Sequence, residues 1–285
     1  MNRNIRLLST VLLVTGITSA LPVTAQYYYK DIINNNEVMA ELGRLKEQKM
    51  RTVKVTSLES NGMESEGFFC EKKINRSYTE MEVMTSTSTS YPNIFTSVFS
   101  KDGMLNETID SSEVSATHTY YTYDERKRLT RISSITRFAE DENGDNEVDI
   151  TTEDHIYGYG SGNAPEKMTL IKNNKDTVNI LFQADERGHV GIEKNSRTAE
   201  IYYYYYDSKG RVTEIVHGYA SNKKLVPDYK FEYGSNGLVM QMIASEKEGA
   251  YFFTWKYNYD GLLRIRERCY SKEGSLMGSA EYEYK

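Results

Sequence analysis

The sequence predicts a mainly β protein: an antiparallel hairpin meander that forms a twisted or curled sheet, with one N-terminal α-helix. Three observations predict it. Aromatic or apolar residues alternate with polar residues over much of the chain, which is the pattern of half-buried strands. A unit made of an aromatic residue, a turn and an apolar residue recurs about every 24 residues. One segment near the N-terminus instead places its apolar residues at helical spacing.

The first 25 residues have the order of a secretory leader. A start with two arginines is followed by an apolar stretch over residues 7–21 and by the small-x-small site Val23-Thr24-Ala25. The alternative is a membrane anchor, but the stretch is short for a bilayer and is interrupted by Thr and Ser. We therefore expect cleavage after Ala25 and one β-rich domain over residues 26–285. The mature chain would lie in the periplasm, at the cell surface or outside the cell.

The segment that follows the leader predicts the helix. The asparagines at 34–36 suit an N-cap, and basic residues gather toward the far end, where they complement the helix dipole. The apolar residues at helical spacing are Val38, Met39, Leu42 and Leu45. We expect a helix over about residues 36–50 whose apolar stripe packs on a sheet.

After the helix the hydrophobic period changes to two, and hairpin units follow over about residues 95–285. In each unit, Gly stands four positions after an aromatic residue, and an apolar residue stands two positions further on. Clear copies begin at Phe99, Tyr206, Tyr233 and Tyr257, and less regular ones at Tyr123, Tyr159 and Phe182. Lys127 replaces the Gly of the Tyr123 copy. Because Gly supplies the positive φ of a tight turn, each unit is predicted to turn there.

One of these copies carries a resemblance to a known family. The stretch Tyr206–Val212 reads YDSKGRV and resembles the YD repeat of RHS-type secreted proteins, whose unit is Tyr-Asp, two variable residues, Gly-Arg and an aliphatic residue. Tyr123-Asp124 with Arg128-Leu129 is similar, whereas other copies lack the Asp or the Arg. The resemblance implies a curling β-sheet that encloses or displays something, and it brings no catalytic residue. A leader followed by degenerate hairpins is also similar to small exported bacterial families of unknown function.

Composition excludes several classes of function. Lys and Arg number 35 against 41 Asp and Glu, so the net charge of −6 argues against nonspecific nucleic-acid binding. A mean hydropathy of −0.63 argues against a polytopic membrane protein. Predicted strand faces mix Glu and Arg with apolar residues, so we expect no membrane span and disfavour an outer-membrane barrel. The sequence leaves the oligomeric state open.

A search for catalytic or metal-binding patterns returns one weak candidate. The histidines at 118, 155, 189 and 217 have no metal-ligand spacing, and the glycine-rich segment at 158–162 matches no nucleophile elbow. We therefore expect no catalytic residue and no cofactor other than calcium. Alternate oxygen ligands suggest a calcium loop at Asp141, Asn143, Asp145 and Asp149. We favour a solvated acidic hairpin tip, because the pattern departs from the EF-hand, and the calcium loop is the alternative.

Two further candidates come from tyrosine and cysteine. The run Tyr202, Tyr203, Tyr204, Tyr205 and Tyr206 would make both faces of a strand aromatic. Either the strand is packed on both sides, or an exposed face forms an aromatic platform for glycan, peptide or cell-wall material. In an exported chain, Cys70 and Cys269 either form a disulfide or remain two separate buried thiols.

These observations favour a noncatalytic exported protein of the cell envelope, with a binding or structural role and an envelope glycan or protein as its partner. The first alternative is an extracellular polysaccharide hydrolase, which would need two carboxylates about 5–10 Å apart in a cleft. The second is a shell or delivery component related to YD-repeat proteins. A broad aromatic face without a carboxylate pair would favour binding.

Overall fold

A computed structural model describes residues 27–139, 150–219, 225–246 and 249–285. The predicted leader and the predicted calcium ligands Asp141, Asn143, Asp145 and Asp149 lie outside the described residues. The described chain is mainly β with one N-terminal helix, as the sequence predicts. No helix in these ranges combines the length and the apolar content needed to cross a membrane.

The helix α1 spans Lys30–Glu47. It is followed by strands β1 (Thr52–Glu59), β2 (Phe69–Ile74), β3 (Glu80–Thr87), β4 (Ser90–Phe99), β5 (Leu105–Ser111), β6 (Ser115–Tyr123), β7 (Leu129–Phe138), β8 (Ile150–Tyr159), β9 (Pro165–Lys172), β10 (Asp176–Ala184), β11 (Val190–Asn195), β12 (Glu200–Tyr206), β13 (Val212–Tyr219), β14 (Val226–Tyr233), β15 (Val239–Glu246), β16 (Tyr251–Asp260), β17 (Leu263–Tyr270) and β18 (Leu276–Tyr284).

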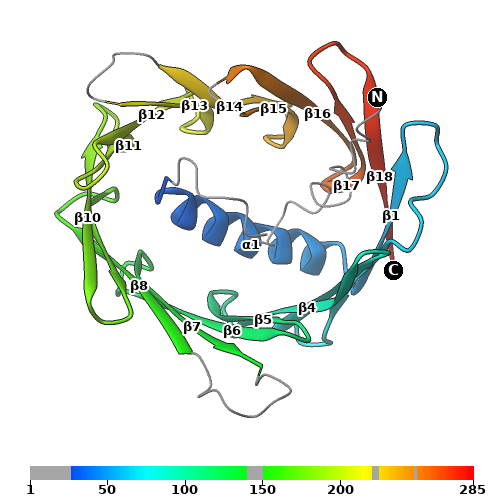
Figure 1. The fold of residues 1–285 in the computed structure, drawn as a ribbon, viewed down its shortest axis with the longest axis horizontal. Coiled ribbons are helices and arrows are strands. Elements are labelled where there is room, and N and C mark those ends of the chain that lie inside the picture. The colour runs from blue at the N-terminus through cyan, green and yellow to red at the C-terminus, as the bar shows by residue number, and fades with distance from the viewer. Residues whose placement is uncertain (1–26, 140–149, 220–224, 247–248) are drawn as a thin grey trace, which may run out of the picture.

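The sheet closes into a barrel of 18 antiparallel strands (Figure 1). Each strand pairs with the next one along the chain, and β1 pairs with both β2 and β18. Val53 of β1 thus stands opposite Lys72 on one side and Tyr284 on the other. The predicted antiparallel meander is confirmed, but the sheet closes into a barrel and is not merely twisted or curled. Closure pairs the backbone groups of both edges, which an open sheet would leave exposed.

The helix lies inside the barrel (Figure 1). Its buried Leu42 and Leu45 pack against inward side chains of β1, β2, β4 and β5, which are Val53, Ile74, Phe99 and Leu105. The prediction that its apolar stripe packs on a sheet is confirmed, and the sheet is the inner wall of the barrel. The helix begins at Lys30 with Tyr29 as its N-cap, before the predicted residue 36, so the asparagines at 34–36 lie inside the helix and do not cap it.

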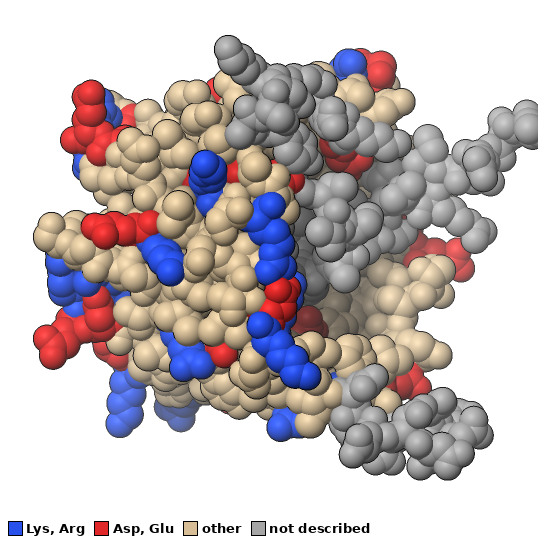
Figure 2. Space-filling model, turned by 60° about the vertical axis from the view of Figure 1, so that its left-hand side comes forward, with Lys and Arg blue, Asp and Glu red and all other residues tan. Residues whose placement is uncertain are grey.

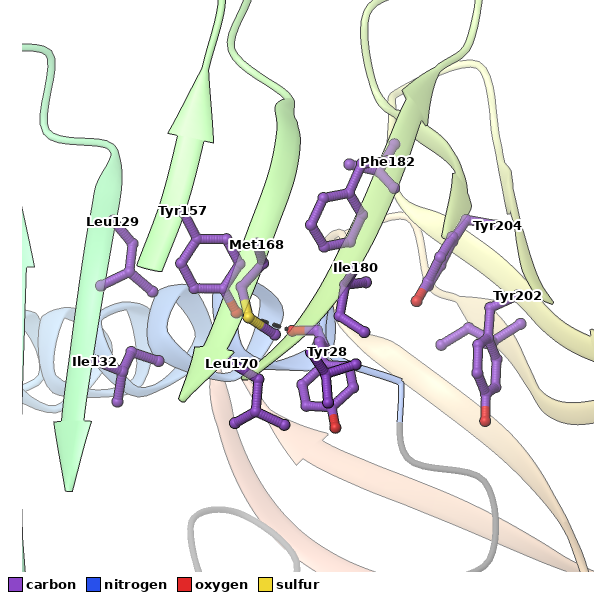
Figure 3. Packing of buried hydrophobic residues seen from close by; sticks show 13 residues of the cluster. Tyr28, Leu129, Ile132, Tyr157, Met168, Leu170, Ile180, Phe182, Tyr202 and Tyr204 are labelled. Carbon is purple, nitrogen blue, oxygen red and sulfur yellow. Dashed lines mark hydrogen bonds between the residues drawn. The ribbon is translucent and has the colours of Figure 1, made fainter. Parts of the chain in front are cut away.

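Alternation along the strands gives the wall two different faces. Inward residues form a continuous apolar layer around the start of the helix, including Tyr157, Met168 and Ile180 (Figure 3). Outward residues include ion pairs across neighbouring strands, such as Arg131–Asp154 at 3.0 Å and Lys230–Glu214 at 3.2 Å. Figure 2 shows acidic and basic side chains interspersed over one side of this surface.

The predicted hairpin turns are confirmed at the four clear repeat copies. β4 ends at Phe99, β12 at Tyr206 and β14 at Tyr233, each followed by a turn, and Tyr257 lies beside the turn that follows β16. In the YDSKGRV copy, the Asp207 carboxylate accepts hydrogen bonds from the backbone N–H groups of Lys209 and Arg211 and from Arg211 Nε. Gly210 adopts a φ of +77°, the conformation for which the sequence selects Gly.

Candidate binding site in the barrel interior

The segment before the helix is held by a buried carboxylate of the wall. Glu193 on β11 is 1% exposed, and its two oxygens accept the N–H groups of Tyr28 at 2.7 Å and Tyr29 at 2.9 Å. The hydroxyl of Tyr204 donates to the same carboxylate at 2.7 Å. Burial raises the pKa of Glu193 to about 7, although these donors oppose the rise. Glu193 therefore holds the segment that precedes the helix against β11.

The tyrosine run of β12 contributes to this anchorage from one face. Tyr202 and Tyr204 are buried against Tyr27, with ring centroids 5.6 and 6.2 Å apart, and Tyr206 is half-buried. Tyr203 and Tyr205 face outward, and Tyr205 is 49% exposed. The alternative of a strand packed on both sides is thus wrong. The inner tyrosines are core residues, and an outer aromatic contact surface stays a prediction.

A histidine links the helix to a second strand of the wall. His155 on β8 bonds through Nδ1 to Asp31 of α1 at 2.6 Å and through Nε2 to Glu153 at 2.7 Å. Burial disfavours the charged imidazole, but Asp31 and Glu153 together raise the pKa of His155 to about 9. The pKa of Glu153 falls to about 2 despite its burial, because His155 and Lys172 stabilise the carboxylate. These charges form a chain, Asp31–His155–Glu153–Lys172.

The outer end of this charge chain borders a pocket. The pocket has a volume of about 390 Å³ and is lined by Ser134, Thr136, Thr151, Thr152, Glu153, Lys172 and Asn173. Glu153 stands opposite both Ser134 and Lys172 in the sheet, and it shares the inward face of β8 with His155. The pocket therefore lies on the inner wall of β7, β8 and β9. Ligand sites commonly occupy the mouths of β-barrels.

Most of the pocket's polar groups are already oriented by one hydrogen bond. Ser134 bonds to Thr119 and Thr136 to Thr117, each at 2.9 Å. Asn173 Oδ1 accepts the N–H of Thr152 at 2.9 Å, and Lys172 Nζ lies 2.9 Å from Glu153. Each hydroxyl and the ammonium group can make at least one further hydrogen bond. The arrangement is suited to binding a small polar molecule through several hydrogen bonds.

The described pocket residues offer little for covalent or hydrolytic chemistry. Among them Glu153 is the one carboxylic acid, and both of its oxygens are engaged by His155 and Lys172. A glycosidase site requires a second carboxylate across the substrate. The ranges that the structure describes also contain no group of three or more His, Cys, Asp or Glu side chains placed to hold a metal ion.

The predicted disulfide is not formed. Cys70 and Cys269 are free, buried thiols on β2 and β17. Strands β1 and β18 lie between them in the closed barrel, so the two cysteines are three strand spacings apart, on the order of 14 Å. A disulfide needs Cα atoms within about 7 Å. The alternative of two separate buried thiols is correct.

Sequence reasoning missed the residues that build the site: Glu153, His155, Lys172 and Glu193. Each follows the strand alternation and is polar at an inward position, but the sequence does not show which face of β8, β9 or β11 points inward. The helix supplies Asp31 as a partner of His155, and the segment before the helix supplies the N–H groups that bind Glu193. The place of both inside the barrel depends on closure. The polar residues at inward positions of β7 and β8 were the sequence feature that could have located the site.

Comparison of the sequence with protein-family models and with curated proteins finds no match. Among solved structures, the Tc toxin complex TcdB2-TccC3-TEV is similar over 78% of this chain at 12% identity, with a TM-score of 0.34, and 12% of that chain is covered. The Photorhabdus luminescens Tc holotoxin pore is similar over 75% of this chain at 12% identity, with a TM-score of 0.31 and 12% of that chain covered. A porin-like protein from Bacteroides uniformis is similar over 83% of this chain at 9% identity, with a TM-score of 0.33 and 96% of that chain covered. All three similarities are distant.

Proposed function

We propose that this chain is an exported, noncatalytic binding protein that takes a small hydroxyl-bearing ligand, such as a saccharide of the cell envelope, in the interior pocket. The observation that carries the proposal is the pocket itself, in which hydroxyl, amide, carboxylate and ammonium groups converge on about 390 Å³ of the inner wall. Pockets of this size and larger hold small-molecule ligands. Export rests on the predicted leader, so the periplasm, the cell surface and the medium all remain open as locations.

The wall around the pocket is suited to this role because its groups are held in place. Hydroxyl pairs tie β6 to β7, and the charge chain from Asp31 to Lys172 ties the helix to β8 and β9. A site whose side chains are fixed before binding loses less conformational entropy when the ligand arrives. Ion pairs on the outer face are suited to contact with water.

The two alternatives receive less support. Hydrolysis would need a second carboxylate beside Glu153, and the described pocket residues provide none. A shell that encloses cargo would need free interior space, whereas α1 lies across the barrel. The outward tyrosines at 203 and 205 are a second candidate surface, supported by the exposure of Tyr205.

The test is binding of the mature chain, residues 26–285, to a glycan array and a polyol panel, with each ligand that binds then titrated by calorimetry. We expect a double variant Ser134→Ala and Thr136→Val to weaken binding at least tenfold, because it removes two pocket hydroxyls. Thr122→Val on the outer face of β6 is the matched control and should bind like the parent chain. Binding unaffected by the double variant, or absent for every ligand, would contradict the proposal.

A further inference from the structure

We infer that the ligand of the interior pocket carries a carboxylate, so that its chemical class is a small hydroxy acid such as a hexuronate. The inference rests on the proposed function and depends on the balance of donors and acceptors around the pocket. Hydroxyl groups can act as either, so the other pocket groups decide the balance. These are Glu153, Lys172 and Asn173.

The acceptors among these three groups are engaged. Glu153 receives His155 on Oε1 and Lys172 on Oε2, at 2.7 and 2.9 Å. Asn173 Oδ1 receives the backbone N–H of Thr152. Each of these oxygens already accepts one hydrogen bond, so a ligand that presented mainly donors would have to share them with His155, Lys172 and Thr152.

Donors remain available. Lys172 has three ammonium protons and gives one to Glu153, and its side chain is 49% exposed. The Nδ2 of Asn173 donates to no residue in the part of the chain that the structure describes. These neighbouring residues at the end of β9 can therefore bind the two oxygens of one carboxylate. The hydroxyls of Ser134, Thr136 and Thr151 can then bind ligand hydroxyl groups.

The charges near the pocket also favour a ligand that carries a carboxylate. Lys172 and His155 lie on either side of Glu153, and Asp31 lies beyond His155, inside the barrel. Asp176 stands opposite Lys172 in the sheet, but Arg197 holds both of its oxygens at 2.6 and 2.8 Å. Lys172 is thus the charged group that is left to meet a ligand. A hydrogen bond between charged partners is stronger than one between neutral groups.

The experiment titrates the mature chain with a panel of hexuronates and with the parent hexose of each. The expected result is at least tenfold tighter binding of one hexuronate than of its own hexose. Lys172→Met should reduce this preference to about onefold, measured as the ratio of the hexuronate and hexose dissociation constants of the same variant. Lys167→Met, on the outward face of the same strand, is the matched control and should keep the preference.

The outcomes separate this inference from the proposed function. Equal binding of a hexuronate and its hexose, lost in the Ser134→Ala and Thr136→Val double variant, would overturn the carboxylate inference and leave the pocket as the binding site. Retention of the hexuronate preference in Lys172→Met would also overturn it. Failure of the glycan and polyol panels to bind at all would overturn both. A circular dichroism spectrum like that of the parent chain confirms that each variant is folded.

Discussion

The hydroxyl of Tyr233 donates a hydrogen bond of 2.7 Å to the carbonyl of Val212, the first residue of the strand that leaves the preceding repeat turn. The same bond recurs around the barrel at 2.7–2.8 Å. The pairs are Tyr123–Leu105, Tyr159–Leu129, Tyr206–Val190, Tyr233–Val212, Tyr259–Val239 and Tyr284–Arg264. Each of these six tyrosines thereby ties its hairpin to the one before it. This accounts for part of the excess of 24 Tyr over 9 Phe, because Phe cannot donate the bond.

Tyr233→Phe should lower the free energy of unfolding by about 1 kcal/mol, because the Val212 carbonyl loses its donor. The measurement is the urea midpoint of the mature chain. Tyr205→Phe is the control, since Tyr205 faces outward and no hydrogen bond of its hydroxyl to the described chain is found. Equal effects of the two substitutions would contradict a structural role for the repeated bond.

Lys127→Gly should raise the free energy of unfolding by about 1 kcal/mol. Lys127 adopts a φ of +60° in the turn position that Gly103, Gly210 and Gly237 occupy in other repeats. A side chain is disfavoured there, and its removal relieves that cost. The measurement is the thermal midpoint. Gly103→Ala is the reverse test and should destabilise by a similar amount, since no neighbour lies within 4 Å of the added Cβ and the effect is that of φ alone.

The repeat allowed the turns and the strand direction to be predicted, and the helical spacing of apolar residues allowed the helix to be predicted, because each depends on residues close in sequence. Closure could not be predicted, because pairing of Val53 with Tyr284 joins the two ends of the chain and leaves no local pattern. The interpretation of the tyrosines was half right. Tyr205 is exposed, as an aromatic platform requires, but Tyr202 and Tyr204 are buried against Tyr27. This contact depends on the position of the helix inside the barrel, which the sequence does not show.

The anchorage of the helix should depend on pH. The pKa of Glu193 is raised to about 7 and that of His155 to about 9, so both groups bind protons more tightly when folded. Their contributions are complete below the unfolded pKa values, near 4.3 and 6.5, and are lost as pH rises through about 7 and 9. Glu153 acts oppositely: its pKa near 2 gives stability above pH 4.3 that is lost on acidification. Stability should therefore be greatest at about pH 4.5, decline toward about pH 7 as the Glu193 contribution is lost, and decline further toward about pH 9 as that of His155 is lost.

The pH dependence is measured as the urea midpoint between pH 4.5 and 9.5. In Glu193→Gln the decline through pH 7 should disappear, because the titrating group is gone. The variant should also be less stable at pH 5 by about 1–3 kcal/mol, since the carboxyl group of Glu193 meets the two backbone N–H groups with two oxygens and the amide would turn its NH2 group toward one of them. If the urea midpoint of this variant fell through pH 7 as steeply as that of the parent chain, Glu193 would not be the group that causes the loss of stability.

The two cysteines should remain thiols in the protein purified after export. Burial raises the pKa of Cys70 to about 11 and that of Cys269 to about 12, so neither forms the reactive thiolate at neutral pH. We expect slow reaction with a thiol reagent in buffer and two reactive groups per chain in urea. An intact mass that matches the oxidised chain would contradict the closed arrangement of β17, β18, β1 and β2.

The central claim is that the ligand binds on the inner wall of β7, β8 and β9. Hydrogen exchange of the mature chain tests it most directly, measured with and without a saturating concentration of the hexuronate that binds most tightly. We predict slower exchange at residues 134–136, 151–153 and 172–173, with no change around Tyr203 and Tyr205. Slower exchange at Tyr203 and Tyr205 with none at the pocket residues would contradict it and place binding on the outer face.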